Sequence, residues 1–299
     1  MFQIFVDSAA NLPAVTAKKY DIHVISFINL VEGKEITCYH PDLSPEEERQ
    51  KGTEYYNAMR NGCEIKTGLI STATFEKAFQ TALEADQDVL YFSLSKNISG
   101  NYNSARLAAE DLLERYGKQH KIRLVDSLNA SLAQGILAIY ASEMREKGMS
   151  VDETADILES YVGKMNGVFT VGDLKYLSHT GRIKGSVATI GNMLKIKPIL
   201  RGNKDGYIVT YKNVRGRKSA LNELANLLCN NIEHPEEQII GIAHADAYED
   251  SLYVMEKIQQ KIKVREFINT SYDFCTGSHV GPDTIALFFI GKDRELDQK

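Results

Sequence analysis

The sequence predicts an α/β protein of two domains, a largely parallel sheet with flanking helices followed by a smaller α/β domain with a mixed sheet. Its 299 residues are about twice the length of a typical domain. Short apolar runs alternate with helical patterns, and helical connections allow neighbouring strands to run parallel. The pattern changes near residues 162–166, and a hairpin is expected beyond that point. We therefore place the domains at residues 1–164 and 165–299.

Two helices of the first half are expected to begin with capping boxes, SPEE at residues 44–47 and SVDE at residues 150–153. In this motif the serine and the glutamate satisfy each other's free backbone N–H groups, and Pro45 suits the first helical turn. The remaining elements follow from apolar periodicity and from turn residues. In order, we expect a strand at 2–6, a helix from Pro13 to about 20, a hairpin of 23–30 and 35–39, a helix from 44 toward 59, a helix from 72, a strand at 88–94, a helix at 100–116, a strand at 122–125 and a helix at 130–147.

The second half is expected to be richer in strands. A hairpin should form around the turn GNKDG at residues 202–206, because glycines flank polar turn residues there. In order, we expect a strand at 167–171, helical segments at 174–179 and 187–194, hairpin strands at 196–200 and 207–211, a helix to about 231, and strands at 238–243, 264–269 and 284–290.

Composition excludes several classes of protein. Hydrophobic residues make up 43% and charged residues 25%, as in a globular protein with a substantial core. No run approaches the ~20 apolar residues of a membrane span. The start, MFQIFVD, lacks the basic region of a signal peptide. Cys38, Cys63, Cys229 and Cys275 show no C-x-x-C spacing, so we expect reduced thiols in a cytoplasmic protein.

The net charge of -5 conceals a basic stretch. Residues 182–218 contain ten lysines or arginines and a single acid, Asp205. One interpretation is a solvated basic face. The other is a docking surface for a negatively charged partner, phosphate head groups or a membrane leaflet, with Arg182 and Arg215 as its candidate residues. Nucleic acid is disfavoured, because the whole chain is acidic and no aromatic residues alternate with the basic ones.

Three short polar segments form the candidate binding site: KTGLIS at residues 66–71, ISGNY at 98–102 and HVGP at 279–282. Each places a hydroxyl or an imidazole beside backbone that can turn sharply. None carries a carboxylate or a thiolate, so no metal site is expected. Together they predict a site for an anionic head group, assembled from both domains.

The ends of the expected parallel strands support this site. Asp7-Ser8 follows the first strand, Ser93 begins the segment that leads to Gly100, and Asp126-Ser127 follows the 122–125 strand. Ligands of open α/β sheets sit outside the carboxyl ends of the strands. We therefore expect a polar rim there, with Gly100, Ser127 and Gly281 at the periphery of the site.

Structural roles remain open for the same residues. Ser99 suits a helix N-cap, which is compatible with anion binding because a helix N-terminus presents free N–H groups. Thr67 suits the end of a strand, and Ser71 suits a helix cap. His279 is expected in a loop, where a histidine is more often a surface residue than a catalyst.

An enzyme is the alternative to a binding protein. Ser99 as nucleophile and His279 as base would make an acyl hydrolase or an acyltransferase. The G-x-S-x-G elbow is absent, since residues 97–101 are NISGN. Neither the phosphate-binding loop G-x-x-x-x-G-K-[ST] nor G-x-G-x-x-G occurs, so no ATP site is expected. We expect a chain that is non-catalytic on its own.

Ordered sequence blocks run along nearly the entire chain: VDSAANLP at 6–13, KT at 66–67, ISGNYNSA at 98–105, VDS at 125–127, DLKYL at 173–177, GRI at 181–183, KPIL at 197–200 and HVGP at 279–282. Together these blocks resemble the DegV family of bacterial fatty-acid-binding proteins. The resemblance implies a long-chain, palmitate-like fatty acid as ligand and no cofactor. Several family members carry the lipid for a fatty acid kinase and present its carboxylate to a separate ATP-using subunit.

Carried over by position, the resemblance makes Thr67, Ser99 and His279 the ligands of the fatty acid carboxylate. The basic stretch with Arg182 and Arg215 then becomes the dock for the kinase subunit or for anionic lipid. A lipid-responsive interaction module that works through this basic stretch is a further alternative. Neither the acyl chain length, its unsaturation nor the oligomeric state follows from the sequence.

The chain departs from the family pattern at several positions: a proline usual in the segment after Thr67 is absent, Ser26 stands where the family has a proline, and three further residues differ near the site. Gly68 stands where the family usually has serine, Asn101 where it has threonine, and Asp283 where it has glycine. Asp283 would oppose a bound carboxylate if it pointed inward, and it would be neutral to binding if it pointed outward.

Overall fold

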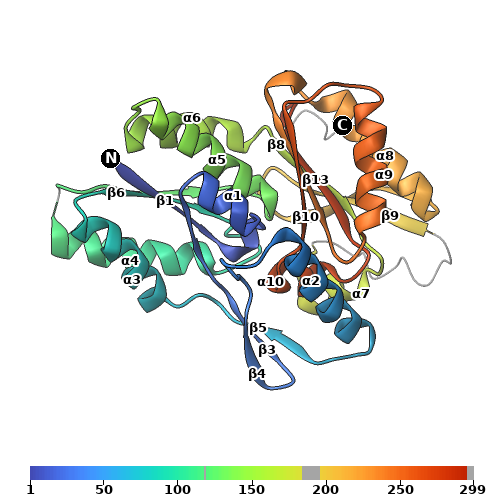
Figure 1. Ribbon diagram of the computed structural model, residues 1–299, viewed down its shortest axis with the longest axis horizontal. Helices are drawn as coiled ribbons and strands as arrows, with labels where there is room; N and C mark the ends of the chain where they lie inside the picture. Colours follow the sequence, from blue (N-terminus) through green and yellow to red (C-terminus); the bar gives the residue numbers. More distant parts are fainter. Residues whose placement is uncertain (118, 184–195, 295–299) are drawn as a thin grey trace.

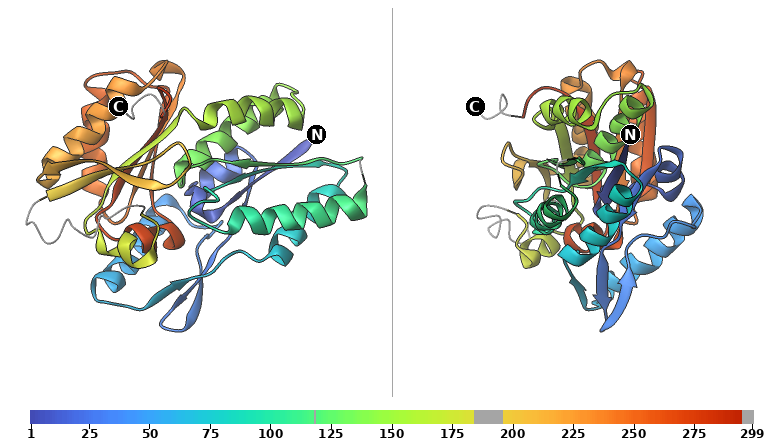
Figure 2. Two further views of the ribbon diagram at one scale, coloured as in Figure 1. Left: turned by 180° about the vertical axis from the view of Figure 1, so that it is seen from behind. Right: turned by 90° about the vertical axis from the view of Figure 1, so that its left-hand side faces the viewer.

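The computed structural model describes residues 1–117, 119–183 and 196–294, and within them the chain forms three β-sheets with flanking helices (Figure 1). The four-stranded sheet A and the six-stranded sheet C lie side by side, as the view from behind also shows (Figure 2). The small sheet B projects from the lower edge of the molecule in Figure 1.

Sheet A is parallel, with the strand order β2-β1-β6-β7. Its strands are β1 (Phe2–Asp7), β2 (Ile22–Ile25), β6 (Asp88–Ser93) and β7 (Ile122–Asp126). The predicted parallel sheet is therefore confirmed. The chain winds in opposite directions on either side of the β1–β6 pair, the place where open α/β sheets bind ligands. Asp7, Ser93 and Asp126 end their strands at that same edge.

Alternating side chains of sheet A build two separate cores. Ile4 and Val6 face the core that contains helix α5, whereas Phe5 faces the core that contains helices α3 and α4. This alternation is the period of two that a strand covered on both faces requires. The helices of the first half are α1 (Ala14–Lys19), α2 (Pro45–Arg60), α3 (Thr72–Glu84), α4 (Asn101–Tyr116), α5 (Leu132–Glu146) and α6 (Val151–Val162), with a 3-10 turn at Ser8–Ala10.

Both predicted capping boxes are present. The Ser44 hydroxyl accepts from the Glu47 N–H, and the Glu47 carboxylate accepts from the Ser44 N–H at 2.8 Å. Ser150 and Glu153 make the same pair of bonds at the start of α6. Helices α2 and α6 consequently begin where the sequence predicts.

The predicted 23–30 strand is divided in the structure. Its first part is β2 of sheet A, and its second part is β3 (Ile28–Val31) of sheet B. The break falls at Phe27, whose N–H donates to the Ser8 hydroxyl at 3.1 Å instead of to a neighbouring strand. Beyond it, β3 and β4 (Lys34–Thr37) form the predicted hairpin, and β5 (Ile65–Thr67) completes the sheet.

Sheet C is mixed, as predicted, with the order β10-β9-β8-β13-β11-β12. Only β11 and β12 pair in parallel, and the other neighbours are antiparallel. It has more strands than sheet A although it belongs to the shorter part of the chain. The strands are β8 (Met165–Thr170), β9 (Ile196–Gly202), β10 (Ile208–Arg215), β11 (Ile239–His244), β12 (Glu266–Ser271) and β13 (Ile285–Ile290).

The helices of the second half include two that the sequence patterns left unassigned, α9 (Tyr248–Gln259) and α10 (Phe274–Val280). The expected segments around 174–179 and before 231 appear as α7 (Lys175–Thr180) and α8 (Arg217–Asn231), and a 3-10 turn occupies Pro235–Glu237. The helix expected at 187–194 lies outside the described residues.

Helix α5 joins the two large sheets. A Cβ atom on Gly241 of β11 would lie 2.8 Å from the Leu132 Cβ, so glycine permits this close approach. The core on this side continues from Ile4 and Leu90 of sheet A to Ala286 of sheet C. The predicted boundary at residue 164 lies between α6 and β8, and the division into domains stays a prediction.

Candidate functional site

A cavity lies where the loops at the carboxyl edge of sheet A face sheet C and helix α10. The space open to the centre of a water-sized sphere is about 150 Å³. A single water needs about 10–15 Å³ on that measure, so the cavity holds far more than one solvent molecule. Its wall is mostly apolar and includes Phe27, Leu94, Phe169, Val280 and Phe288.

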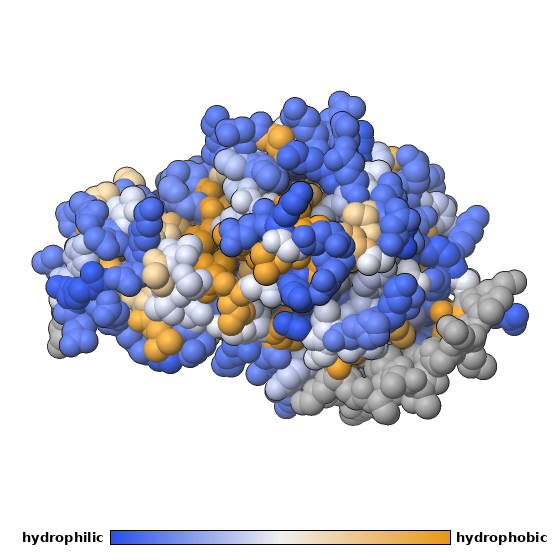
Figure 3. Space-filling view, turned by 90° about the horizontal axis from the view of Figure 1, so that it is seen from below, coloured by the Kyte–Doolittle hydropathy of each residue, from blue (hydrophilic) through white to orange (hydrophobic). Residues whose placement is uncertain are grey.

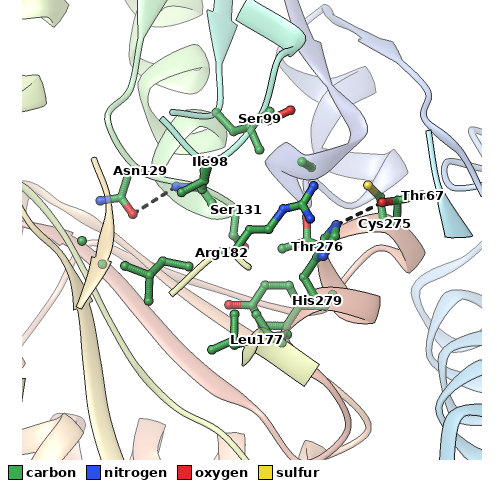
Figure 4. A pocket seen from close by; sticks show the side chains of 18 of the residues that line it. Thr67, Ile98, Ser99, Asn129, Ser131, Leu177, Arg182, Cys275, Thr276 and His279 are labelled. Atoms are coloured by element: carbon green, nitrogen blue, oxygen red, sulfur yellow. Dashed lines mark hydrogen bonds between the residues drawn. The ribbon is translucent and has the colours of Figure 1, made fainter. Parts of the chain in front are cut away.

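The three predicted ligand residues, Thr67, Ser99 and His279, all line this cavity (Figure 4). Thr67 Oγ1 and His279 Nε2 lie 3.2 Å apart, within hydrogen-bond distance, although 212 residues separate them in the chain. The structure therefore brings together the three segments that the sequence singled out.

Each of these residues occupies a defined place in the fold. Thr67 is the last residue of β5 and pairs with Asn29 of β3. Ser99 precedes Gly100, which is the N-cap of α4, and the Ser99 hydroxyl accepts from the Asn101 N–H at 3.3 Å. Ser99 thus caps a backbone group from one position before the N-cap, and its role at the helix start is compatible with its place in the cavity wall.

The prediction that His279 lies in a loop is wrong, because it belongs to the last turn of α10. Asp273 starts this helix by accepting from the Thr276 N–H at 2.8 Å. Gly281, with φ 79°, ends it. A seven-residue helix that contains Gly277 shows too few turns for a recognisable period.

Burial controls the charge of His279. Removal from water, together with the positive charge of Arg182, lowers the pKa of the imidazole to about 4. His279 is therefore neutral near pH 7. Its Nδ1 atom is buried and has no hydrogen-bond partner among the described residues.

Arg182 was expected on a docking surface. In the structure it lines the same cavity as the three predicted ligand residues. Its side chain extends toward His279 and Thr67 (Figure 4). The turn that carries it follows Gly181, which ends α7 in the left-handed conformation at φ 68°. Arg182 therefore adds a permanent positive charge to a wall for which the sequence predicted two hydroxyls and an imidazole.

Arg215 lies elsewhere. It ends β10 and is exposed, whereas Ile183, the neighbour of Arg182, bridges to Ile208 at the start of the same strand. Seven residues of strand span about 23 Å. The two arginines therefore do not form one compact patch.

The predicted peripheral residues support the wall from behind. The fully buried Ser127 accepts from the Asn129 N–H at 3.3 Å, and Asn129 lines the cavity. A Cβ on Gly100 would lie 3.1 Å from Leu69, another lining residue. A Cβ on Gly281 would lie 2.1 Å from the Tyr176 ring, so only glycine fits there.

The three departures from the family pattern near the site have different positions. Gly68 lines the cavity. Asn101 is fully buried beneath it. Asp283 points away, since its carboxylate pairs with Arg60 of α2 at 2.7 Å. The outward alternative for Asp283 is thus the one the structure adopts.

Apolar side chains also mark the surface beside the cavity. Leu69 lines the cavity and is 60% exposed, while Ile28 of the adjoining sheet B is 50% exposed. Orange apolar surface gathers in the middle of the face seen from below (Figure 3). The cavity wall therefore reaches the surface at an apolar residue.

Some lining residues were missed from the sequence. Cys275 and Thr276 of α10 and Tyr272 before it contact the cavity, and Asn129 and Ser131 follow β7. The signal that could have revealed α10 is Asp273 followed three residues later by Thr276, the spacing of an N-cap and its N3 residue. Within the described residues, no group of three His, Cys, Asp or Glu side chains suits a metal ion, and no helix is long and apolar enough to cross a bilayer.

The fold and this cavity define an α/β protein with two large sheets and a mostly apolar pocket whose wall carries hydroxyls, an imidazole and a guanidinium. A family model described as "Uncharacterised protein, DegV family" matches residues 1–292. The chain belongs to the DegV family.

Individual relatives agree with this membership. A DegV domain-containing protein of Clostridium perfringens is 36% identical, covering 98% of this chain and 99% of the relative. A protein of Thermotoga maritima named "Fatty acid-binding protein" is 30% identical, with 95% and 96% covered. A DegV lipid-binding protein from Thermotoga maritima, known from a crystal structure, is 29% identical to this chain in sequence. The two structures superpose with a TM-score of 0.82, covering 98% of this chain and all of the other.

Proposed function

We propose that this protein binds a long-chain fatty acid, with the carboxylate held by Thr67, Ser99 and His279. The observation that carries the proposal is the convergence of these three side chains on one mostly apolar cavity. The names given to relatives from Thermotoga maritima, a fatty acid-binding protein and a DegV lipid-binding protein, support the same ligand class.

The head-group chemistry follows from the protonation state of His279. Because the imidazole is neutral, one ring nitrogen carries a hydrogen and the other accepts. With the hydrogen on Nε2, His279 donates to Thr67, whose own hydroxyl hydrogen is then free for a carboxylate oxygen. The Ser99 hydroxyl offers a second donor, and Arg182 favours the anion electrostatically.

The acyl chain supplies most of the affinity. Burial of one CH₂ group contributes ~0.8 kcal/mol, so a chain of about 15 methylenes contributes roughly 12 kcal/mol before the costs of association and ordering. The apolar wall formed by residues such as Leu94, Phe169 and Phe288 suits this burial.

The direct test is mass spectrometry of an organic extract of the purified protein, beside a denatured and washed control. We expect about one fatty acid per chain, or uptake of one added equivalent of palmitate. A protein that arrives empty and takes up no added fatty acid would contradict the proposal.

Variants locate the head group. His279→Ala and Ser99→Ala are expected to lose retained fatty acid while remaining folded. Ser71→Ala is the matched control, because Ser71 lies four residues beyond Thr67 and does not line the cavity. Its hydroxyl caps α3, accepting from the Thr74 N–H at 3.1 Å and pairing with the Thr74 hydroxyl at 2.8 Å. Unchanged lipid content in both site variants would contradict the residue assignment.

We further propose that the protein presents the fatty acid to a separate kinase subunit, which transfers a phosphoryl group from ATP to the carboxylate. Exposed Arg215 is the docking candidate on this protein. The test combines the loaded protein with candidate kinase subunits from the same genome and ATP, and measures acyl phosphate. Arg215→Glu should weaken complex formation without changing lipid content.

The same assays distinguish the other candidate functions. An acyl hydrolase would require a hydrogen bond between the Ser99 hydroxyl and the His279 ring. Among the described residues His279 pairs with Thr67 instead, and no hydrogen bond joins it to Ser99. Turnover of an activated acyl ester that Ser99→Ala abolishes would favour the enzyme. Fatty-acid-dependent binding of an acidic partner without phosphorylation would favour an interaction module.

A further inference from the structure

The dipeptide Asp7-Ser8 at the end of β1 is linked by hydrogen bonds, directly or through one intervening side chain, to all the segments that carry the proposed ligand residues. Both residues are buried, Asp7 fully and Ser8 at 4% exposure, and neither lines the cavity. Two chains of hydrogen bonds leave this dipeptide in different directions. We refer to Asp7 and Ser8 together as the hub.

The first chain runs from Asp7 through Asn101. The Asp7 carboxylate accepts from the Asn101 side-chain amide at 3.3 Å, and the Asn101 side-chain oxygen accepts from the Ile70 N–H at 3.1 Å. Asn101 follows the Ser99-Gly100 segment directly, and Ile70 follows the Thr67–Leu69 segment of the cavity wall. One buried side chain therefore ties the Thr67 segment to the Ser99 segment.

Asp7 itself is held on all sides. Its carboxylate also accepts from the Tyr91 hydroxyl at 2.7 Å, the Gln134 amide at 2.8 Å and the Ala9 N–H at 3.1 Å. A buried carboxylate is costly unless donors surround it, and here they come from the 3-10 turn after β1 and from β6, α4 and α5. The carboxylate is thus a fixed reference point within sheet A.

The second chain runs from Ser8 to α10. The Ser8 hydroxyl donates to the Asp273 carboxylate at 3.3 Å and accepts from the Phe27 N–H at 3.1 Å. Asp273 is the N-cap of α10, the helix that carries His279, and Phe27 lines the cavity. Ser8 therefore links the His279 helix and the apolar wall to the same end of β1.

We propose that the Asp7-Ser8 hub is the positioning element that sets the mutual geometry of Thr67, Ser99 and His279 for carboxylate recognition. Neither hub residue touches the ligand in this arrangement. The hub acts through Asn101 on two ligand segments and through Asp273 on the third. The inference rests on the proposed carboxylate site and extends it to residues outside the cavity.

The test separates head-group geometry from general stability. Asp7→Asn and Ser8→Ala are compared with the wild type for binding of palmitate and of hexadecan-1-ol, which has the same chain without a carboxylate. We expect each variant to weaken palmitate binding about tenfold, as for loss of one hydrogen bond to a charged group, with hexadecanol binding unchanged within about twofold. A purely structural role would weaken both ligands equally.

Asp126→Asn is the matched control. Asp126 also ends a strand of sheet A and accepts from a following N–H, that of Leu128 at 3.0 Å, but it makes no contact with the hub. It should leave the ratio of palmitate to hexadecanol affinity unchanged. If Asp7→Asn does not fold, Asn101→Ala cuts the first chain and replaces it in the comparison.

A second readout is independent of fatty acid binding. The ¹⁵N signals of the His279 ring in the ligand-free protein should shift in both hub variants and not in Asp126→Asn. The positioning role of the hub would be overturned if the ¹⁵N signals of both hub variants stayed unshifted. It would also be overturned if the wild type preferred palmitate and the hub variants kept the same ratio of palmitate to hexadecanol affinity. A wild type that binds no fatty acid would overturn the proposed function, and the ring signals would then decide the hub alone.

Discussion

Two buried histidines of this protein can be compared directly, His279 in the cavity and His244 at the end of β11. Burial lowers the pKa of each imidazole to about 4. In each case a residue in the left-handed conformation follows two positions later, Gly281 with φ 79° and Asp246 with φ 52°. Each ring has a buried Nδ1 without a partner among the described residues. Taken alone, the two histidines look equivalent.

Their surroundings differ. His279 shares its cavity with Thr67, Arg182 and a mostly apolar wall. His244 borders an open groove beside α2 and α9 that contains the acids Glu46, Asp246 and Glu249. A buried neutral histidine is therefore not sufficient for an anion site. The groove also contains Arg49 and hydroxyl side chains, so neither of these distinguishes the two places. A hydroxyl within hydrogen-bond distance of the ring, a lining without acidic side chains among the described residues and a mostly apolar wall distinguish the cavity from the groove.

The largest expected effect is a loss of stability at acidic pH, which both buried histidines should cause. An unfolded histidine has a pKa near 6.5, so between pH 6.5 and 4 the unfolded state holds one more proton than the folded state at each site. Acidification over this range should therefore cost up to about 3 kcal/mol of unfolding free energy per histidine. Urea unfolding at pH 7 and pH 4.5 should show a smaller loss in His279→Asn, and likewise in His244→Asn, than in the wild type.

Asp273 has the opposite effect on the pH dependence of stability, and it is present in the wild type and in both histidine variants. Burial raises the pKa of its carboxyl to about 7, so the folded state binds this proton first and acidification below pH 7 stabilises it. The comparison between proteins therefore isolates the histidine. Equal losses in wild type and variants would contradict neutral burial of the rings.

The two histidines should differ in their effect on palmitate binding. His279→Asn should weaken palmitate binding by about 2 kcal/mol, because the ring that donates to Thr67, and so leaves the Thr67 hydroxyl free for the carboxylate, is lost. His244→Asn should leave palmitate binding unchanged. Calorimetric titration with palmitate measures both. Equal weakening would mean that the groove and the cavity are coupled.

The third prediction concerns the left-handed residues. Gly281→Ala should lower the unfolding free energy by about 2 kcal/mol, because an L-residue at positive φ is strained and its Cβ would meet the Tyr176 ring. Gly148→Ala is a control for the strain alone, since φ is 82° and nothing lies within 4 Å of the added Cβ. If both variants lost the same stability in urea unfolding, the Tyr176 contact would carry no weight.

The smallest effect is expected at Asp283. Asp283→Gly removes the partly exposed ion pair with Arg60 but relieves a positive φ of 62°, so the stability should change by less than about 1 kcal/mol. Palmitate affinity should also be unchanged, because Asp283 points away from the cavity. Tighter binding in Asp283→Gly would show that its charge is felt at the head group.

Features with local causes could be predicted from the sequence. The capping boxes at Ser44 and Ser150 join groups three residues apart, so the helix starts followed directly. The parallel order of sheet A followed from helical connections between short apolar runs. The division of the 23–30 run did not, because it depends on the bond between Phe27 and Ser8, which comes from a different strand.

The candidate site shows the same limit. Its polar segments were recognisable from hydroxyls, glycines and an imidazole, and the resemblance to the DegV family singled out Thr67, Ser99 and His279. The sequence by itself therefore determined the capped helix starts and the parallel sheet A, and it predicted the polar groups of the candidate site.

Only the tertiary structure decided that His279 lies in a helix, that Arg182 faces the cavity, that Asp283 turns to Arg60 and that Asp7-Ser8 joins the ligand segments. The Thr67–His279 contact spans 212 residues and the Ser8–Asp273 bond spans 265. Hydrogen bonds and burial of this kind depend on which surfaces meet after folding. A local pattern specifies the groups available, and the packing of the two large sheets specifies which of them meet.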